Sequence, residues 1–293
     1  FVMRRLTGWR MRMQRNKKKE KVKKTTNRTL QEIVPVEVVP FEQGKYKIGK
    51  LHEIGNREGQ QDAFAVSDIS QTEEIRRNGL IAIVSDGMGG LQDGDKISSM
   101  VVLSLFQDFH NQKAGTEVSQ LLLSMLANAN ETVNQFLGNE IGSCGSTLVA
   151  GIIKEDKLHW ISVGDSHIYL YRGGKLLLLN REHIYLNELE LQVVNGEIPY
   201  TEAVEHRERT ALNSFIGMGR LMAVDRNRTG ISLGKGDRIL FMSDGVFGTL
   251  TETQIAQAMQ LSVEDSVEQM HRAIVEAGKK NQDNYTAVIV ECL

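Results

Sequence analysis

Five aspartates carry the clearest chemical signal in this sequence, because each stands beside the end of an apolar, strand-like segment. They are Asp62, Asp86, Asp165, Asp244 and Asp283. A single Asp-Gly pair, as at Asp86 and Asp244, is ordinary turn chemistry. Five such acids are harder to explain as turns. Carboxylates at the ends of neighbouring buried strands would repel one another unless cations neutralised them.

The types of ligand present indicate which cations these would be. Hard oxygen ligands, with only two cysteines and no histidine pair at ligand spacing, favour Mg²⁺ or Mn²⁺ over zinc. The glycines after Asp86 suit a loop whose backbone approaches an ion closely, so that a carbonyl can serve as a ligand. Two such ions about 3.5–4 Å apart are a known device for hydrolysing phosphate esters, with an arginine holding the phosphate.

A scaffold of short strands must position these acids. Strands are predicted at 46–54, 63–68, 80–85, 146–154, 157–163, 167–172, 175–179, 237–243 and 285–291. Gly173 and Gly174 join two of these segments, and a Gly-Gly pair indicates a hairpin because both residues tolerate positive φ. Strands linked in this way favour antiparallel sheets.

Helices are predicted at 96–110, 116–137, 251–260 and 262–277. The last two start at Thr251-x-x-Gln254 and Ser262-x-x-Asp265, spacings typical of capping boxes, and Gly278 is a candidate C-cap. Hairpin-linked strands interrupted by helix pairs predict an α+β fold and not a doubly wound parallel sheet. Residues 183–225 are polar and weakly periodic, which predicts an insertion over one face.

Six short motifs follow one another along the chain. They are Arg57-x-x-Gln60-Gln61-Asp62-Ala63, Asp86-Gly87-Met88-Gly89-Gly90 with Gly94, Gly145-Ser146-Thr147, Val163-Gly164-Asp165-Ser166, Ser243-Asp244-Gly245 and Asp283-Asn284-x-Thr286. In order and spacing they resemble the metal-dependent protein serine/threonine phosphatases of the protein phosphatase 2C family, bacterial type. The resemblance covers about residues 46–291, and 195–206 is similar to the flap of bacterial members.

The resemblance implies a four-layer α-β-β-α sandwich, with two antiparallel sheets flanked by helix pairs and the metals at one edge. It implies a phosphatase domain at 46–293 with a flap at about 183–225, and residues 1–45, outside the resemblance, are expected to form a basic N-terminal arm and linker. The implied activity is hydrolysis of phosphoserine and phosphothreonine in proteins. A water that bridges two Mn²⁺ or Mg²⁺ ions would attack phosphorus directly, without a phosphoenzyme.

Site residues are carried over position by position. The implied metal ligands are the carboxylates of Asp62, Asp86, Asp165, Asp244 and Asp283 and the carbonyl of Gly87. Asp86 would bridge two ions, Asp62 would act through metal-bound water, and Asp165 would hold a third ion. The implied catalytic residues are Arg57, Asp62 and Asp86. The guanidinium of Arg57 would grip the phosphate with two parallel hydrogen bonds, a geometry that lysine cannot reproduce.

Three positions depart from the family's pattern. Gln60 stands where the family usually has Asn, and His167 where it commonly has Arg. Met88, as in bacterial relatives, replaces a histidine proposed as the general acid of animal members. Metal-bound water is therefore the expected proton donor to the leaving group. Gln60 and His167 also motivate an alternative hypothesis, a catalytically weak regulatory module of the same fold that binds phosphoproteins.

Composition excludes several other classes of protein. The chain of 293 residues is 41% hydrophobic and 25% charged with only three prolines, which fits a globular protein and excludes a disordered or fibrous one. Its two cysteines, Cys144 and Cys292, exclude a disulfide scaffold and indicate a reducing compartment, so a cytoplasmic location is expected. The chain begins with Phe1 and not Met, which leaves open that it is part of a longer protein.

The formal net charge of −2 hides a strong asymmetry. Residues 1–28 hold twelve Lys/Arg and one acid, which leaves 23 basic and 36 acidic residues in 29–293. The apolar residues of this arm share one helical face: Val2, Leu6, Trp9 and Met13. Such a pattern suits an anionic membrane surface, here at the inner face of the membrane. A solvated tail, or one folded onto the acidic body, is an open alternative, and no nucleic-acid partner is expected.

Four other residues could suggest sites but have simpler explanations. His159 lies within a predicted strand and is expected to be hydrogen-bonded there, not to bind a metal. His167 is expected to pack near the site without taking part in catalysis, and Cys144 to be inert. Asp93 is expected to cap a helix and not to belong to a calcium loop.

Overall fold

The computed structural model describes residues 45–89 and 93–293. Its strands are β1 (Tyr46–Glu53), β2 (Asp62–Val66), β3 (Leu80–Met88), β4 (Gly145–Ser146), β5 (Leu148–Lys154), β6 (Lys157–Val163), β7 (His167–Arg172), β8 (Lys175–Leu178), β9 (Asp225–Arg226), β10 (Ile231–Ser232), β11 (Arg238–Met242) and β12 (Tyr285–Cys292). Its helices are α3 (Thr72–Asn78), α4 (Gly94–His110), α5 (Val118–Leu137), α6 (Leu186–Asn195), α7 (Tyr200–Glu205), α8 (Asp244–Phe247), α9 (Glu252–Ala258) and α10 (Val263–Ala277), with a 3₁₀ turn at Gly138–Glu140. In the described part, no helix has both the length and the apolar character needed to cross a bilayer.

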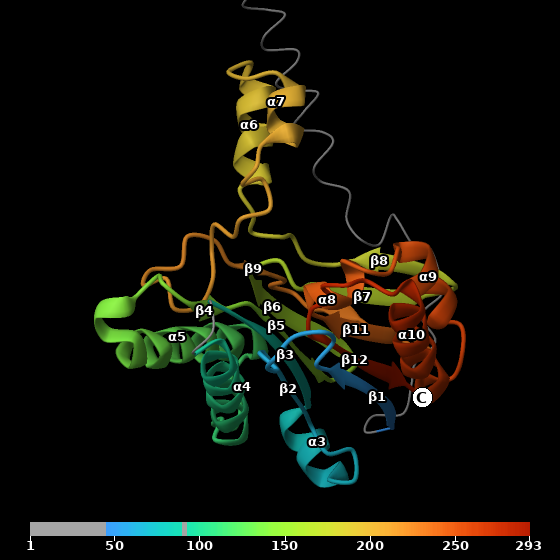
Figure 1. Cartoon of the computed structure of the whole chain (residues 1–293). Coiled ribbons are helices and arrows are strands. Elements are labelled where there is room, and N and C mark those ends of the chain that lie inside the picture. The colour runs from blue at the N-terminus through green and yellow to red at the C-terminus, as the bar shows by residue number, and fades with distance from the viewer. Residues whose placement is uncertain (1–44, 90–92) are drawn as a thin grey trace, which may run out of the picture. The chain divides into compact units, whose positions relative to one another are not determined.

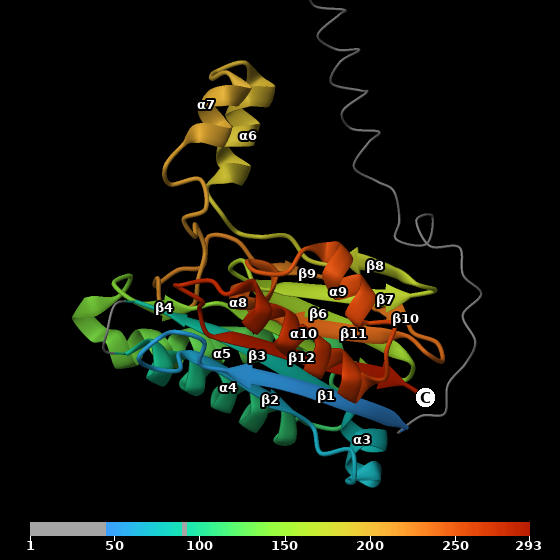
Figure 2. The same ribbon diagram turned by 45° about the vertical axis from the view of Figure 1, so that its right-hand side comes forward.

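The strands form two antiparallel sheets. One has the order β1-β12-β11-β7-β8, and the other has β10-β6-β5-β3-β2 with β4 beside β3 and β9 beside β6. The sheets lie face to face, with α4 and α5 on one outer side and α9 and α10 on the other (Figures 1 and 2). The predicted α+β four-layer sandwich is therefore confirmed.

Three apolar cores hold these layers together. The core between the sheets includes Val84, Val149, Phe241 and Val288, and the ring of Phe241 packs directly over Gly151, where a side chain would clash with it. A second core joins the β3 sheet to α4 and α5, and a third joins the β12 sheet to α8, α9 and α10. Because the inner strands β3, β5 and β12 are covered on both faces, their sequences read as continuous apolar runs.

Local signals in the sequence mostly produce the expected structure. Thr251 and Gln254 form the full capping box of α9, and Gly278 closes α10 in the left-handed conformation. Ser262 caps α10 through the Asp265 amide, but the Asp265 carboxylate accepts from the Ser262 hydroxyl and does not complete a box. Asp93 precedes α4, yet its side chain pairs with Lys96 and makes no capping hydrogen bond, so that expectation was wrong in its detail.

The segment 183–225 was expected as a polar insertion with weak periodicity, and it contains two helices. Helices α6 and α7 pack on each other as a hairpin that stands off both sheets in both views (Figures 1 and 2). At its base the rings of Tyr185 and His206 meet edge to face, 5.2 Å apart. The helices are short and surround a small core at Leu189 and Ala203, so their apolar periodicity is weak in the sequence.

Candidate active site

A cavity of about 760 Å³ opens where several strands end. Its walls come from the loop before β2, the end of β3, the start of α4, the loop after β6, the flap and the segments before α8 and β12. The lining residues are Asn56, Arg57, Glu58, Gly59, Gln60, Gln61, Asp86, Gly87, Met88, Gly89, Asp95, Thr147, Asp165, Leu212, Asp244 and Asp283. The structure thus brings Arg57, Asp86, Gly87, Asp165, Asp244 and Asp283 to one pocket.

Asp62 and Asp86 are directly opposite each other in the register of β2 and β3. Opposed residues of an antiparallel pair project to the same face, so two carboxylates separated by 24 positions in sequence meet side by side. Asp86 lines the cavity, whereas Asp62 is 5% exposed and is not among the residues that line it. Of the acids expected in the site, Asp62 is therefore the one that does not reach the pocket surface.

The Asp62 carboxylate is held on one oxygen only. Its Oδ2 accepts hydrogen bonds from the hydroxyls of Ser243 and Thr286, both at 2.7 Å, while its Oδ1 is buried without a partner. Burial raises the pKa of Asp62 to about 6, against the opposing effect of these two hydrogen bonds and with a further contribution from Asp244. The residue is thus fixed in orientation and keeps one oxygen available.

Burial and neighbouring carboxylates raise the pKa values of Asp86, Asp165 and Asp244. Burial, followed by repulsion from Asp62 and Asp244, raises the pKa of Asp86 well above its ordinary value. Burial and the neighbouring Asp244 raise the pKa of Asp165 to about 7. The pKa of Asp244 is raised by burial and by Asp283, although a hydrogen bond with Asp86 partly offsets this. Several carboxylates are therefore crowded where only protons or cations can balance their charge.

The residues present fit divalent metal ions. Among residues 45–89 and 93–293, no three carboxylate, imidazole or thiol groups already converge as a complete ion-binding cluster. However, Asp62 and Asp244 each have a buried Oδ1 without a hydrogen-bond partner, and an unpaired buried oxygen is costly unless a ligand satisfies it. The ligand set consists of carboxylates and a backbone carbonyl, which are the ligands of Mg²⁺ and Mn²⁺.

Gly87 occupies a place that no other residue could fill. A Cβ atom there would lie 2.1 Å from the carbonyl oxygen of Gly94 and 2.7 Å from that of Gln61. The backbones of β3, the start of α4 and the loop before β2 therefore approach one another at this point. This close approach explains why glycine follows Asp86, and Gly87 itself lines the pocket.

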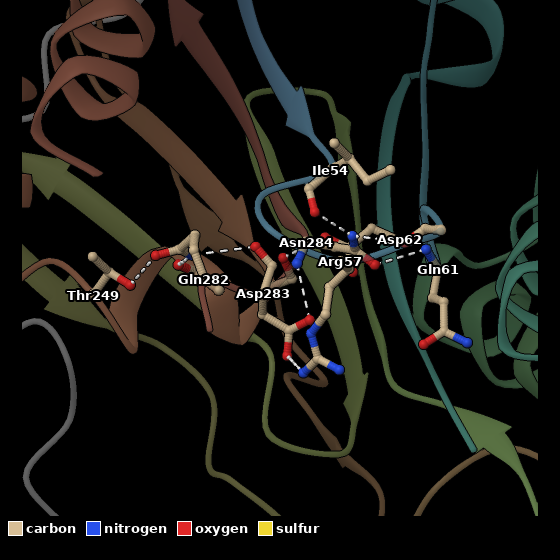
Figure 3. Close-up of polar contacts among 11 residues, drawn as sticks. Ile54, Arg57, Gln61, Asp62, Thr249, Gln282, Asp283 and Asn284 are labelled. Atoms are coloured by element: carbon tan, nitrogen blue, oxygen red, sulfur yellow. Dashed lines mark hydrogen bonds and ion pairs between the residues drawn. The ribbon is translucent and has the colours of Figure 1, made fainter. Parts of the chain in front are cut away.

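The loop that carries Arg57 is fixed by Asn284. The Asn284 side chain accepts a hydrogen bond from the Gln61 amide at 2.8 Å and donates to the carbonyls of Ile54 and Gly59 at 2.7 and 3.0 Å (Figure 3). The Arg57 guanidinium in turn donates to the Asp283 carboxylate at 2.6 Å (Figure 3). The Asn284 side chain therefore connects the loop of Arg57, the candidate phosphate-binding residue, to the segment that carries Asp283.

The departures at Gln60 and His167 have structural roles. The Gln60 side chain accepts a hydrogen bond from the Asp62 amide at 3.0 Å and so closes the turn into β2. His167 is paired with Glu182 at 2.7 Å and stacks on Phe247 with ring centroids 3.7 Å apart. His167 therefore packs beside the site, as expected, and braces α8, which begins with Asp244.

Several residues that support the site were not assigned a role in the sequence analysis. Ser243 and Thr286 hold Asp62, Asn284 holds the Arg57 loop, and the Thr147 hydroxyl accepts a hydrogen bond from the Asp86 amide at 3.1 Å. All four lie inside the motifs quoted above. The signal was therefore present, but only the fold shows which atoms these side chains contact.

Two other expectations can be compared with the structure. His159 was expected to be satisfied by hydrogen bonds in its strand, and this was wrong in part, because its Nδ1 is buried without a partner. Burial lowers the pKa of this histidine. Cys144 is half-buried, and its Cβ atom lies against Gly89. Neither residue lines the cavity.

Comparison with known proteins agrees with this architecture. Residues 48–291 match the family described as protein phosphatase 2C. A serine/threonine phosphatase, stp, of Listeria monocytogenes is 28% identical over 224 residues, which is 74% of this chain and 86% of that protein.

The fold is also similar to those of solved bacterial phosphatase structures. The serine/threonine phosphatase of S. agalactiae superposes with a TM-score of 0.70 at 25% identity, covering 85% of this chain and 100% of that one. The catalytic domain of PstP in complex with two manganese ions superposes with a TM-score of 0.64 at 22% identity, covering 85% and 98%.

Proposed function

The chain belongs to the protein phosphatase 2C family of metal-dependent serine/threonine phosphatases, and from this premise we propose how its own residues carry out the reaction. The substrate is a phosphorylated serine or threonine side chain of a protein. The observation that supports this most directly is the cavity that brings Arg57 together with Asp86, Asp165, Asp244 and Asp283. When bound, two Mn²⁺ or Mg²⁺ ions supply Lewis acidity, which withdraws charge from the phosphate and makes water a stronger nucleophile.

Asp86, Asp244 and Asp283, with the Gly87 carbonyl, are proposed to hold these two ions, and Asp165 to hold a third. The raised pKa values of Asp86, Asp165 and Asp244 support the proposal, because carboxylates that repel one another bind cations favourably. Asp86 lies centrally, since it is influenced by the charges of all the others. It is therefore the proposed bridging ligand.

Arg57 is proposed to bind the phosphate. Among the residues that line the cavity it is the one basic side chain, and a guanidinium can hold two phosphate oxygens in parallel hydrogen bonds. The Arg57 side chain is 53% exposed, so a substrate can reach it from solvent. Asp62 is proposed to act from beside Asp86 through a water molecule at its unpaired Oδ1.

This proposal is tested by hydrolysis of para-nitrophenyl phosphate and of phosphoserine, phosphothreonine and phosphotyrosine peptides. Each substrate is tested with Mn²⁺, with Mg²⁺ and with a chelator. We expect metal-dependent turnover of the small substrate and of the first two peptides, and its loss in Asp86→Asn. Metal binding without turnover would instead favour the regulatory, phosphoprotein-binding alternative. The hydrogen bond by which Gln60 closes the turn into β2 and the stacking of His167 on Phe247 give structural explanations for the two departures that motivated that alternative.

We also propose that residues 1–28 attach the enzyme to the inner, anionic face of the cytoplasmic membrane. These residues lie outside the part of the chain that the structure describes. Twelve basic residues and one apolar helical face support the proposal. Co-sedimentation with vesicles of anionic or neutral lipid tests it. The full chain should pellet with anionic vesicles at low salt, and residues 29–293 should not. Equal behaviour of the two chains would refute it.

A further inference from the structure

The flap returns to the body of the domain through residues 211–219, here called the return segment. One of its residues, Leu212, lines the cavity that contains Arg57 and Asp86. At Ile216 the segment pairs with Ser146 of β4 through two backbone hydrogen bonds of 3.0 and 2.9 Å. The Ser146 hydroxyl donates to the Asp86 backbone carbonyl at 2.8 Å, so the return segment is connected through Ser146 to the backbone of the central acid of the site.

Two asparagines one turn apart on α5 hold the other end of this segment. Asn130 donates to the Gly219 carbonyl at 2.7 Å and accepts from the Gly217 amide at 3.1 Å. Asn134 donates to the same carbonyl at 2.9 Å and accepts from the Gly219 amide at 3.1 Å. We call this set of four hydrogen bonds the asparagine latch. Through it, two side chains satisfy backbone groups of the return segment that a neighbouring strand would otherwise pair with.

The backbone groups involved have no other partners among the contacts of the described residues. The Gly217 carbonyl accepts from the Gly142 amide, so both polar groups of Gly217 are satisfied by residues outside the flap. A Cβ atom on Gly217 would lie 3.1 Å from side-chain carbons of Val133 and Leu137, which shows how closely the segment packs on α5. Removing a latch side chain would leave a partly buried amide unpaired.

From these contacts we propose that Asn130 and Asn134 are positioning residues for the phosphatase reaction. They hold the return segment, and with it Leu212, as a fixed wall of the cleft along which a phosphorylated peptide lies. The proposal rests on the proposed function, because it assigns the wall a role in binding the substrate of that reaction. A wall that must be ordered on each binding event weakens affinity, since the lost conformational entropy opposes binding.

The effect should depend on the size of the substrate. A phosphopeptide contacts the wall beside Arg57, whereas para-nitrophenyl phosphate needs only the phosphate-binding groups. Loss of the latch should therefore raise KM for a phosphopeptide and leave kcat, and both constants for the small substrate, nearly unchanged. Each lost amide contact corresponds to roughly a three- to tenfold change in KM.

The experiment compares Asn130→Ala, Asn134→Ala and the double variant with the wild-type chain, in steady-state kinetics on a phosphothreonine peptide and on para-nitrophenyl phosphate with Mn²⁺. Asn128→Ala is the matched control. Asn128 lies on the same helix and donates a hydrogen bond of 2.8 Å, but its partner is Asp108 of α4 and not the flap. Its kinetics should match the wild type.

Amide hydrogen exchange, followed by NMR, provides a readout that does not depend on turnover. Asn130→Ala should speed exchange of the Gly217 amide, and Asn134→Ala that of the Gly219 amide, each by about tenfold or more. Asn128→Ala should change neither. This residue-by-residue correspondence would not arise from a general loss of stability, which would speed the exchange of amides throughout the domain.

The outcomes separate the possibilities. A raised peptide KM with preserved kcat, together with the two specific changes in exchange, would support the latch as a positioning device. Kinetics equal to those of Asn128→Ala would overturn it. So would a fall in kcat on both substrates with a lowered Tm, since that would show a purely structural role. A wild-type chain that hydrolysed neither substrate would refute the proposed function, while the exchange of the two amides would still decide whether the latch holds the segment.

Discussion

The guanidinium of Arg57 and the carboxylate of Asp283 form an ion pair in which Nη2 lies 2.6 Å from Oδ2. Their proposed partners in the reaction differ, because Arg57 is proposed to bind phosphate and Asp283 to bind a cation. A cation held by Asp283 would therefore compete with Arg57 for the same carboxylate. We expect loss of this ion pair to leave the guanidinium free for the substrate, so that cation binding at Asp283 and phosphate binding at Arg57 would be coupled.

Replacing Arg57 should have different effects on metal affinity and on the turnover of substrate. In Arg57→Ala the competing cation is gone, so Mn²⁺ affinity measured by calorimetry should stay equal or rise, by up to about fivefold for a partly exposed pair. The value of kcat/KM for a phosphopeptide should fall by about 10- to 100-fold, because charge-assisted hydrogen bonds to phosphate are lost.

The matched control is Arg76→Ala. Arg76 pairs with Glu73 on α3 at 2.8 Å and has a similar exposure, but it does not line the cavity. The Arg76→Ala variant should change neither the Mn²⁺ affinity nor kcat/KM for the phosphopeptide. If Arg57→Ala weakened Mn²⁺ binding, the competition described above would be wrong.

Asp244→Asn should stabilise the metal-free protein while it removes activity. The substitution relieves repulsion among buried acids, so Tm in chelator should rise by about 2 °C or more. The increase in Tm that Mn²⁺ produces in the wild type should shrink, and phosphatase activity should fall about 100-fold or more. Thermal unfolding with and without Mn²⁺ tests this. Asp108→Asn, a substitution outside the cavity, should preserve the Mn²⁺ response. A lower metal-free Tm in Asp244→Asn would contradict the argument.

Asp165 should make the metal-free protein less stable as pH rises. Burial raises its pKa to about 7 from an ordinary value of 3.8, so between these values the folded state keeps a proton that the unfolded state releases. The stabilisation is complete below about pH 4 and is lost as pH rises through about 7. The measurement is the free energy of unfolding in urea with chelator at pH 5 and pH 8. Asp165→Asn should gain stability relative to the wild type at the higher pH. Parallel pH profiles for the two proteins would rule out the raised pKa.

Ser243 should contribute to stability through Asp62 and β12. Its hydroxyl donates to the Asp62 carboxylate at 2.7 Å and accepts from the Thr286 amide at 3.0 Å, all of it buried. Ser243→Ala would leave that amide unpaired, which should lower the free energy of unfolding by about 1–3 kcal/mol in a urea titration. Ser124→Ala on α5 removes an exposed serine hydroxyl and should cost no more than about 0.5 kcal/mol. Equal effects of the two substitutions would show that the Asp62 network is not stabilising.

Much of the fold could be predicted from short-range patterns. Most strands and helices α4, α5, α9 and α10 follow from apolar runs, the Gly173-Gly174 hairpin and the caps of α9 and α10, because these depend on neighbouring residues alone. The two-residue strands β9 and β10 were not predicted. Helices α3, α6, α7 and α8 were not predicted. They are four to ten residues long, and so short a helix leaves little periodicity to detect.

The sequence by itself determined the chemistry of the site: acids beside glycines at strand ends, an arginine at 57, and motifs in the order of one enzyme family. Only the tertiary structure decided how these residues relate in space. It shows that Asp62 lies beside Asp86 on the neighbouring strand, that Arg57 pairs with Asp283, and that Asn130 and Asn134 hold the flap's return. The physical reason is that strand register, burial and hydrogen-bond partners depend on contacts between segments far apart in the chain, which local patterns do not encode.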